Sequence, residues 1–269
     1  MNNVNLLEAS KNWNKKSERQ KVQAINKGYK ILRRAAQKQL VLLEQQEKDK
    51  LHIKSSRHLF IFTIVKSFWE NADFAFSLRN KKWNYYAVYP IRTMMEKMLK
   101  LSYFLKQSVE YQNDLSDKEL LFFGKLIYDF EKSIDSDVTE IIKNYNLLKS
   151  LATKRYPNID KVNIKDLKSF PPYEQLCRDR YKKEYSYYRW LSGIPHGQLS
   201  ATLNLKHNGK TEYKRLMMKG NLFCYEILNL TDVYLKNSIS NDVLEAINKA
   251  KNLITSPTLI NRILSKLGL

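Results

Sequence analysis

The sequence predicts a mainly α-helical protein built as a bundle of long antiparallel helices. Its 269 residues include only seven glycines and six prolines, and so few turn-forming residues favour long helices over many short strands. Over several long segments the apolar residues recur at three- and four-residue steps, which is the period of a helix with one buried face. The chain is long enough to bury a core in one large domain or two small ones.

Three helices are expected in the first part of the chain. Residues 17–49 have one apolar face and one basic face, which indicates an amphipathic helix. Residues 55–78 are apolar around most of the helix circumference, so this helix should be central. Residues 83–107 form the third helix, in which Pro90 should produce a kink or mark a restart.

The middle of the chain is predicted to be helical with an acidic bias over residues 108–160. Ser116 followed by Glu119 has the spacing of a capping box, so we expect a helix to begin there. A further helix is expected over residues 172–192, where tyrosines at helical spacing are more typical of a core than of a surface that stacks on nucleic-acid bases.

The last part of the chain contains the only expected strands. The dipeptide Asn208-Gly209 favours a type I′ turn, so we expect a small β-hairpin near residues 202–213. Residues 221–237 should return to a core helix, and residues 240–269 should form one or two short amphipathic helices. We divide the chain into a basic N-terminal arm (1–54), a helical core (55–235) and a C-terminal extension (236–269).

Charge is the strongest compositional indication of a partner. The formal net charge is +20, and basic residues outnumber acidic ones 14 to 5 over residues 1–60. Such a surface attracts nucleic acid and also anionic membranes, although a solvated basic surface without a specific partner has the same composition. The basic residues most suited to contact nucleic acid are Arg178, Arg180, Lys182, Lys183, Lys206, Lys210, Arg33 and Arg34.

Several classes of protein are disfavoured by what the sequence lacks. It contains no glycine-rich phosphate loop, no His-Glu-x-x-His pair and no Cys-x-x-Cys pair, so we expect no cofactor and no metal. Cys177 and Cys224 are lone thiols that fit a reducing cytoplasm. No apolar run reaches about 20 residues, and no secretory signal is visible, so a cytoplasmic protein without a membrane span is expected.

One constellation suits metal-free chemistry on RNA. Arg189 and His196 are separated by nearly two helical turns, and Pro195 should end the helix between them. RNA is cut when its own 2′-hydroxyl attacks the adjacent phosphate, which requires a group that titrates near neutrality and a fixed cation. His196 can supply the first and Arg189 the second.

A second pair lies on the helix predicted over residues 83–107. Arg92 and Glu96 are four residues apart, so their side chains can form an ion pair. Such a pair is usually an ordinary surface feature, but its neighbours here are strongly apolar. Buried charges need partners, and the polar groups around Arg189 and His196 are candidates.

These two motifs carry a resemblance to a known family. An arginine and a histidine separated by six residues at the end of a long helix resemble the signature of the HEPN superfamily. That superfamily consists of all-helical proteins and includes metal-independent ribonucleases, toxins and phage-defence proteins. A closer similarity is to uncharacterised bacterial helical proteins with an Arg-x-x-x-Glu helix and a later Tyr-x-x-Leu-Ser-x-x-x-His motif, here Arg92 to Glu96 and Tyr188 to His196. It covers roughly residues 55–235.

The resemblance implies a helical bundle, a homodimer, and the convergence of Arg92, Glu96, Arg189 and His196 on one site. It implies an RNA-directed protein, a metal-independent endoribonuclease acting as a toxin or anti-phage effector. An antitoxin or another protein of a defence system would then be a partner. The alternative is a non-catalytic module that binds nucleic acid or protein, in which the Arg/Glu/His cluster is structural. A peripheral membrane protein that uses residues 17–49 is a third reading.

Overall fold

The fold was obtained as a computed structural model. It describes residues 15–48, 56–78, 84–133, 170–181, 185–193 and 199–254, together with Trp13 and a few single positions between 139 and 150. The side chains of residues 199–212 lie outside this description, as do those of a few other helical positions.

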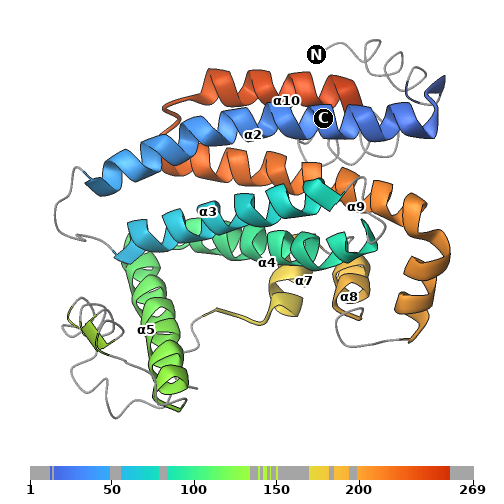
Figure 1. Cartoon of the computed structure of the whole chain (residues 1–269). Helices are drawn as coiled ribbons and strands as arrows, with labels where there is room; N and C mark the ends of the chain where they lie inside the picture. Colours follow the sequence, from blue (N-terminus) through green and yellow to red (C-terminus); the bar gives the residue numbers. More distant parts are fainter. Residues whose placement is uncertain are drawn as a thin grey trace.

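The described residues form helices throughout, which confirms the mainly α prediction (Figure 1). The elements are α2 (Glu18–Lys48), α3 (Ser56–Ser77), η2 (Asn84–Ala87), α4 (Val88–Leu105), α5 (Val109–Ser133), α7 (Tyr173–Tyr181), α8 (Tyr185–Gly193), α9 (Leu199–Tyr234) and α10 (Ser240–Ile254). None of the described helices is long and apolar enough to cross a membrane.

The long helices lie in layers, with α9 in the middle. Helices α2 and α10 lie side by side on one side of α9, and α3 and α4 lie on the other (Figure 1). Helix α9 contacts all four of them. Helices α7 and α8 pack against the far side of α4, so the fold separates them from α2 and α10 (Figure 1).

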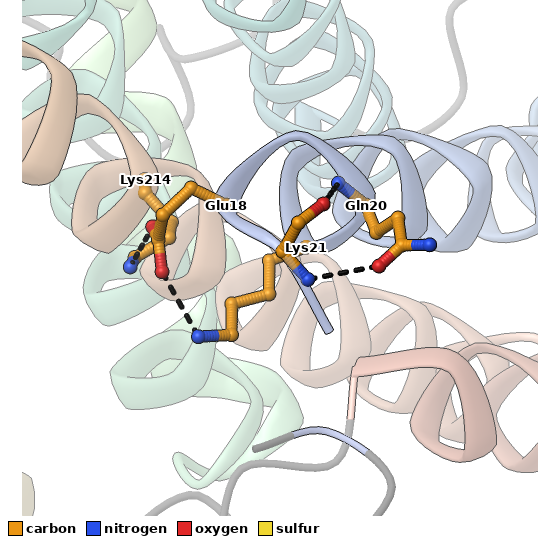
Figure 2. Close-up of polar contacts among 5 residues, drawn as sticks. Glu18, Gln20, Lys21 and Lys214 are labelled. Carbon is orange, nitrogen blue, oxygen red and sulfur yellow. Dashed lines mark hydrogen bonds and ion pairs between the residues drawn. The ribbon is translucent and has the colours of Figure 1, made fainter. Parts of the chain in front are cut away.

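Helix α2 begins with a capping box and is fixed to α9 at the same end. The Ser17 backbone N–H donates to Oε1 of Gln20 at 2.8 Å, and the Gln20 N–H donates to Oγ of Ser17 at 3.3 Å, so each side chain satisfies a backbone donor. Figure 2 shows Glu18 beside this cap, between Lys21 and Lys214. Lys214 belongs to α9, and its Nζ lies 2.5 Å from Oε2 of Glu18.

One apolar core runs through all the layers. Helix α3 contributes many buried side chains to this core, among them the fully buried Phe68 and Trp69. Helices α2 and α10 contribute to the same core, for example through Ile25 and Ile247. The domain boundaries near residues 54 and 235 stay a prediction, although the apolar core continues across both.

The predicted β-hairpin near residues 202–213 is wrong, because this segment is the first part of α9. The alternation around Asn208-Gly209 is weak, and the nearby Leu203, Leu205, Lys206 and Lys210 favour a helix. Asparagine and glycine inside a helix each cost only up to about 1 kcal/mol, which the packing of the long α9 offsets.

Two further expectations need correction. Ser116 does not begin a helix but lies buried within α5, where its Oγ is 3.1 Å from Oγ of Ser56; the hydroxyl that caps α5 is that of Ser108. The helix expected over residues 172–192 is two helices, α7 and α8. Glu174 accepts a hydrogen bond from Tyr185, whereas eleven residues of one helix would span about 16 Å.

Of the kink or restart expected at Pro90, the structure shows a restart. Helix α4 begins at Val88, directly after the short helix η2, and Pro90 lies in the first turn. Proline is tolerated there because the first backbone N–H groups of a helix have no partner within it.

Candidate functional site

A pocket of about 360 Å³ opens between α4, α7 and α8. Its polar lining comes from one residue of α4, two of α7 and three of α8. These residues are Arg92, Tyr173, Glu174, Tyr188, Arg189 and Ser192. Pro172 and Gly193 complete the wall. Because Arg92 comes from a different part of the chain from the others, the packing of α7 and α8 on α4 creates the pocket.

Arg92 lines the pocket and forms an ion pair with Glu96. Its Nε donates to Oε1 of Glu96 at 2.8 Å, and the two side chains are 23% and 16% exposed. The residues lie one turn apart on the same face of α4, as their spacing predicts. The pair is therefore half-buried and is less weakened by solvent than an ordinary surface pair.

Two tyrosines line the pocket beside this pair. Burial raises the pKa of Tyr188, and Glu96 acts in the same direction, whereas the Ser192 hydroxyl and the Arg92 guanidinium partly oppose them. Burial, followed by the charge of Glu96, also raises the pKa of Tyr173. Both phenols therefore stay protonated around neutral pH, when they are hydrogen-bond donors.

Arg189 is exposed at the pocket, on the helix α8 that also carries Tyr188. The Glu174 carboxylate belongs to the same lining but is engaged by groups outside it. It accepts hydrogen bonds from Tyr185 and, at 2.7 Å, from Arg178. These two contacts, in that order, lower the pKa of Glu174, with Arg189 adding a smaller contribution. The Arg178 guanidinium partly offsets the negative charge of Glu174, and the neutral Tyr185 hydroxyl adds a hydrogen bond.

A second ion pair of α4 lies further along the helix than the pair of Arg92 and Glu96. Lys100 pairs with Glu119 of α5, and its Nζ lies 5.0 Å from the centre of the Phe170 ring. Burial, with the nearby Lys100 charge, lowers the pKa of Lys97. Charged side chains thus follow α4 from Arg92, which lines the pocket, to Lys100, which joins α4 to α5 through Glu119.

The expected site residues fall into three groups. Arg92 and Arg189 line the pocket and Glu96 is bound to Arg92. His196 lies outside the described residues, three positions after Gly193 of the pocket wall. The following expected nucleic-acid contacts are also outside the description, at least in their side chains: Arg180, Lys182, Lys183, Lys206 and Lys210.

The remaining expected contacts do not reach the pocket. Arg178 is bound to Glu174 and Tyr185. Arg33 and Arg34 belong to α2, on the opposite side of the bundle from α7 and α8 (Figure 1). Arg33 pairs with Asp73 at 3.0 Å, whereas Arg34 is exposed to solvent.

Sequence reasoning missed the tyrosines and Glu174 of the pocket. Tyr188 was assigned to a core stripe, and it is in fact mostly buried, with 8% of its surface exposed. Tyr173 gave no signal, because nothing in the spacing relates it to Arg92. The proline pair directly before Tyr173 was the available clue, since it places a helix start, and hence α7, at that position.

No group of three or more His, Cys, Asp and Glu side chains that could hold a metal ion occurs in the described ranges. The histidine His58 is bound within the fold, with Nδ1 2.9 Å from the Tyr234 hydroxyl and Nε2 3.0 Å from the Leu43 carbonyl oxygen. Comparisons of the chain with models of protein families, with curated proteins and with solved structures found no match.

Proposed function

We propose that this protein is RNA-directed and that its pocket receives a phosphodiester group. The observation that carries the proposal is that Arg92 and Arg189, from helices far apart in the sequence, line one pocket. A guanidinium can donate two parallel hydrogen bonds to a phosphate, and the two tyrosine hydroxyls add neutral donors. A net charge of +20 would bring polyanions to the surface.

We further propose that the reaction is metal-independent cleavage of RNA. The 2′-hydroxyl attacks the adjacent phosphorus and loses its proton to a base, while the bond to the 5′-oxygen breaks and that oxygen gains a proton. The products are a 2′,3′-cyclic phosphate and a 5′-hydroxyl. Arg189 would stabilise the charge that develops on the phosphate. The sequence assigns the proton transfer to His196.

The test uses total RNA in EDTA with four purified proteins: wild type, His196→Ala, Arg189→Ala and Arg34→Ala. Wild type and Arg34→Ala should cut the RNA, because Arg34 is an exposed arginine remote from the pocket. The other two variants should lose cutting while keeping the melting temperature of the wild type. Equal losses with Arg189→Ala and Arg34→Ala would show that only total charge matters, and cutting by His196→Ala would remove His196 from the mechanism.

A second candidate is a non-catalytic module that binds nucleic acid or protein. It is favoured by the half-buried pairing of Arg92 with Glu96, since a structural pair needs no further role. In that case the wild type does not cut RNA. Truncating Arg92 instead lowers the melting temperature, because Glu96 loses its counter-charge. A homodimer, an antitoxin and a role in phage defence remain proposals that follow from the family resemblance alone.

A further inference from the structure

Two exposed tyrosines lie where η2 leads into α4, before Arg92 of the pocket. Tyr86 of η2 is 45% exposed and Tyr89 of α4 is 44% exposed. Their rings are stacked, with centroids 6.1 Å apart and planes inclined by 23°. The neighbouring Ala87, Val88 and Pro90 are buried, so the backbone is anchored while both rings face solvent. Part of each tyrosine side chain is therefore accessible to a ligand, on a backbone whose neighbouring side chains are buried.

The tyrosine pair is related to the pocket through Tyr89 and Arg92. Tyr89 precedes Arg92 by three residues, so the two side chains are neighbours on one face of α4, about one turn or roughly 5 Å apart along the axis. Arg92 lines the pocket, with Arg189 across from it on α8. Exposed aromatic surface is thus followed along α4 by the guanidinium of Arg92.

We infer that Tyr86 and Tyr89 form a stacking platform for the bases of single-stranded RNA whose phosphate lies at Arg92 and Arg189. This inference rests on the proposed function and adds a base-binding site to it. Every nucleobase has a π-face, so aromatic side chains beside a positive groove bind single strands with little dependence on sequence. A duplex keeps its bases stacked internally and cannot offer them to the platform.

One feature favours nucleic acid over a protein partner. Tyr89 lies one helical turn from Arg92, whose charge complements a phosphate backbone.

The experiment measures binding by fluorescence anisotropy with two labelled oligomers of equal length and charge. One is a 12-nucleotide 2′-O-methyl oligouridylate, which cannot be cut because its 2′-oxygen carries no proton. The other is the same backbone without bases. The proteins are wild type, Tyr86→Ala/Tyr89→Ala, Tyr86→Phe/Tyr89→Phe and Arg189→Ala, and each binding constant is measured over a range of salt concentrations.

Loss of stacking should weaken binding of the oligouridylate about tenfold to a hundredfold in the double alanine variant. The double phenylalanine variant should bind like wild type, and the two double variants should bind the abasic oligomer as wild type does. The slope of log K against log salt should be unchanged by the tyrosine substitutions and reduced by Arg189→Ala, because only the arginine displaces counterions.

Equal oligouridylate binding by wild type and the double alanine variant would overturn the platform but leave the phosphate site in place, provided that Arg189→Ala still weakens binding. If the double alanine variant instead changes the sedimentation of the protein and not its RNA binding, the face is a protein interface. If wild type binds neither oligomer, the platform and the proposed function fall together.

Discussion

Arg92 and Glu96 form an ion pair across one turn of α4, with Nε 2.8 Å from Oε1, and the arginine also lines the pocket. The same pair therefore stabilises the fold and holds a positive group at the candidate site. Glu96 lowers the net positive charge of the pocket while fixing the position of Arg92. Stability and anion affinity should consequently respond in opposite directions when the carboxylate is removed.

We expect Glu96→Gln to lower the free energy of unfolding by about 1 kcal/mol, because the Arg92 guanidinium keeps a neutral partner but loses its counter-charge. Affinity for the oligouridylate should rise. The matched control is Glu245→Gln, which breaks the exposed pair with Lys249 at the same spacing on α10. Its effect on stability should stay within about 0.5 kcal/mol. Urea denaturation of the three proteins measures the changes in stability, and fluorescence anisotropy measures the affinity. A control that loses as much stability as Glu96→Gln would contradict the expectation.

Two buried tyrosines should respond oppositely to the loss of their hydroxyls. The Tyr225 hydroxyl is buried and makes no hydrogen bond to the part of the chain that the structure describes, whereas the Tyr29 hydroxyl donates to Asp73. Tyr225→Phe should raise the free energy of unfolding by about 1 kcal/mol, since an unsatisfied polar atom is removed. Tyr29→Phe should lower it by a similar amount. Thermal and urea unfolding decide the signs, and destabilisation by Tyr225→Phe would show that its hydroxyl is satisfied.

Alkaline pH should destabilise the fold through its buried phenols. Burial raises the pKa of Tyr173, Tyr188 and Tyr225 in the folded protein, so each contributes stability that is complete below the pKa of the unfolded phenol, about 10, and is lost progressively above it. The lowered pKa of Lys97 acts in the opposite sense up to about pH 10.5. Wild type is therefore compared with a tyrosine variant at each pH, because Lys97 contributes to the stability of both proteins.

The measurement is urea denaturation of wild type and Tyr173→Phe/Tyr188→Phe between pH 8 and pH 11. The difference in stability between the two proteins should be constant up to about pH 10 and should then shift in favour of the variant. A difference that does not change with pH would contradict raised pKa values at the pocket.

The contact between α9 and α4 depends on a glycine. A Cβ atom at Gly220 would lie 2.8 Å from Cδ1 of Ile91 and 3.3 Å from Cε2 of Phe76. Valine lacks the Cδ1 atom of isoleucine, so Ile91→Val removes the closest contact. We expect Gly220→Ala to destabilise the wild-type background and to be neutral or stabilising in Ile91→Val, because alanine favours a helix by about 1 kcal/mol over glycine. A double-mutant cycle measures the coupling, and additive effects would mean that the Ile91 side chain moves aside at no cost.

Periodicity was sufficient to predict the long helices. The steps of three and four residues placed α2 and α3 within two residues of their observed ends, because one face of each helix meets the core along its whole length. Local signals failed where tertiary contacts outweighed them. Ser116 has cap spacing, yet it is buried against Ser56 in the middle of α5. Asn208-Gly209 favours a turn locally, yet it lies within the long helix α9.

In the candidate site, too, the features that follow from local spacing were predictable, and those that depend on helix packing were not. The pairing of Arg92 with Glu96 follows from their spacing on one helix and is confirmed. That Arg92 and Tyr173 line one pocket depends on how α7 packs across α4, which no local pattern encodes. Whether His196 acts on RNA stays a prediction.

The central position of α9 has a consequence for how the protein is made. Asn221 of α9 donates to the Ile25 carbonyl oxygen, 196 residues earlier in the chain, and Gln39 of α2 donates to the Leu228 carbonyl oxygen. At roughly 5 to 20 residues per second, α2, α3 and α4 leave the ribosome several seconds before the helix that covers them. The apolar faces that later pack against α9 lack this partner for that time, which makes the nascent chain prone to aggregation until α9 emerges.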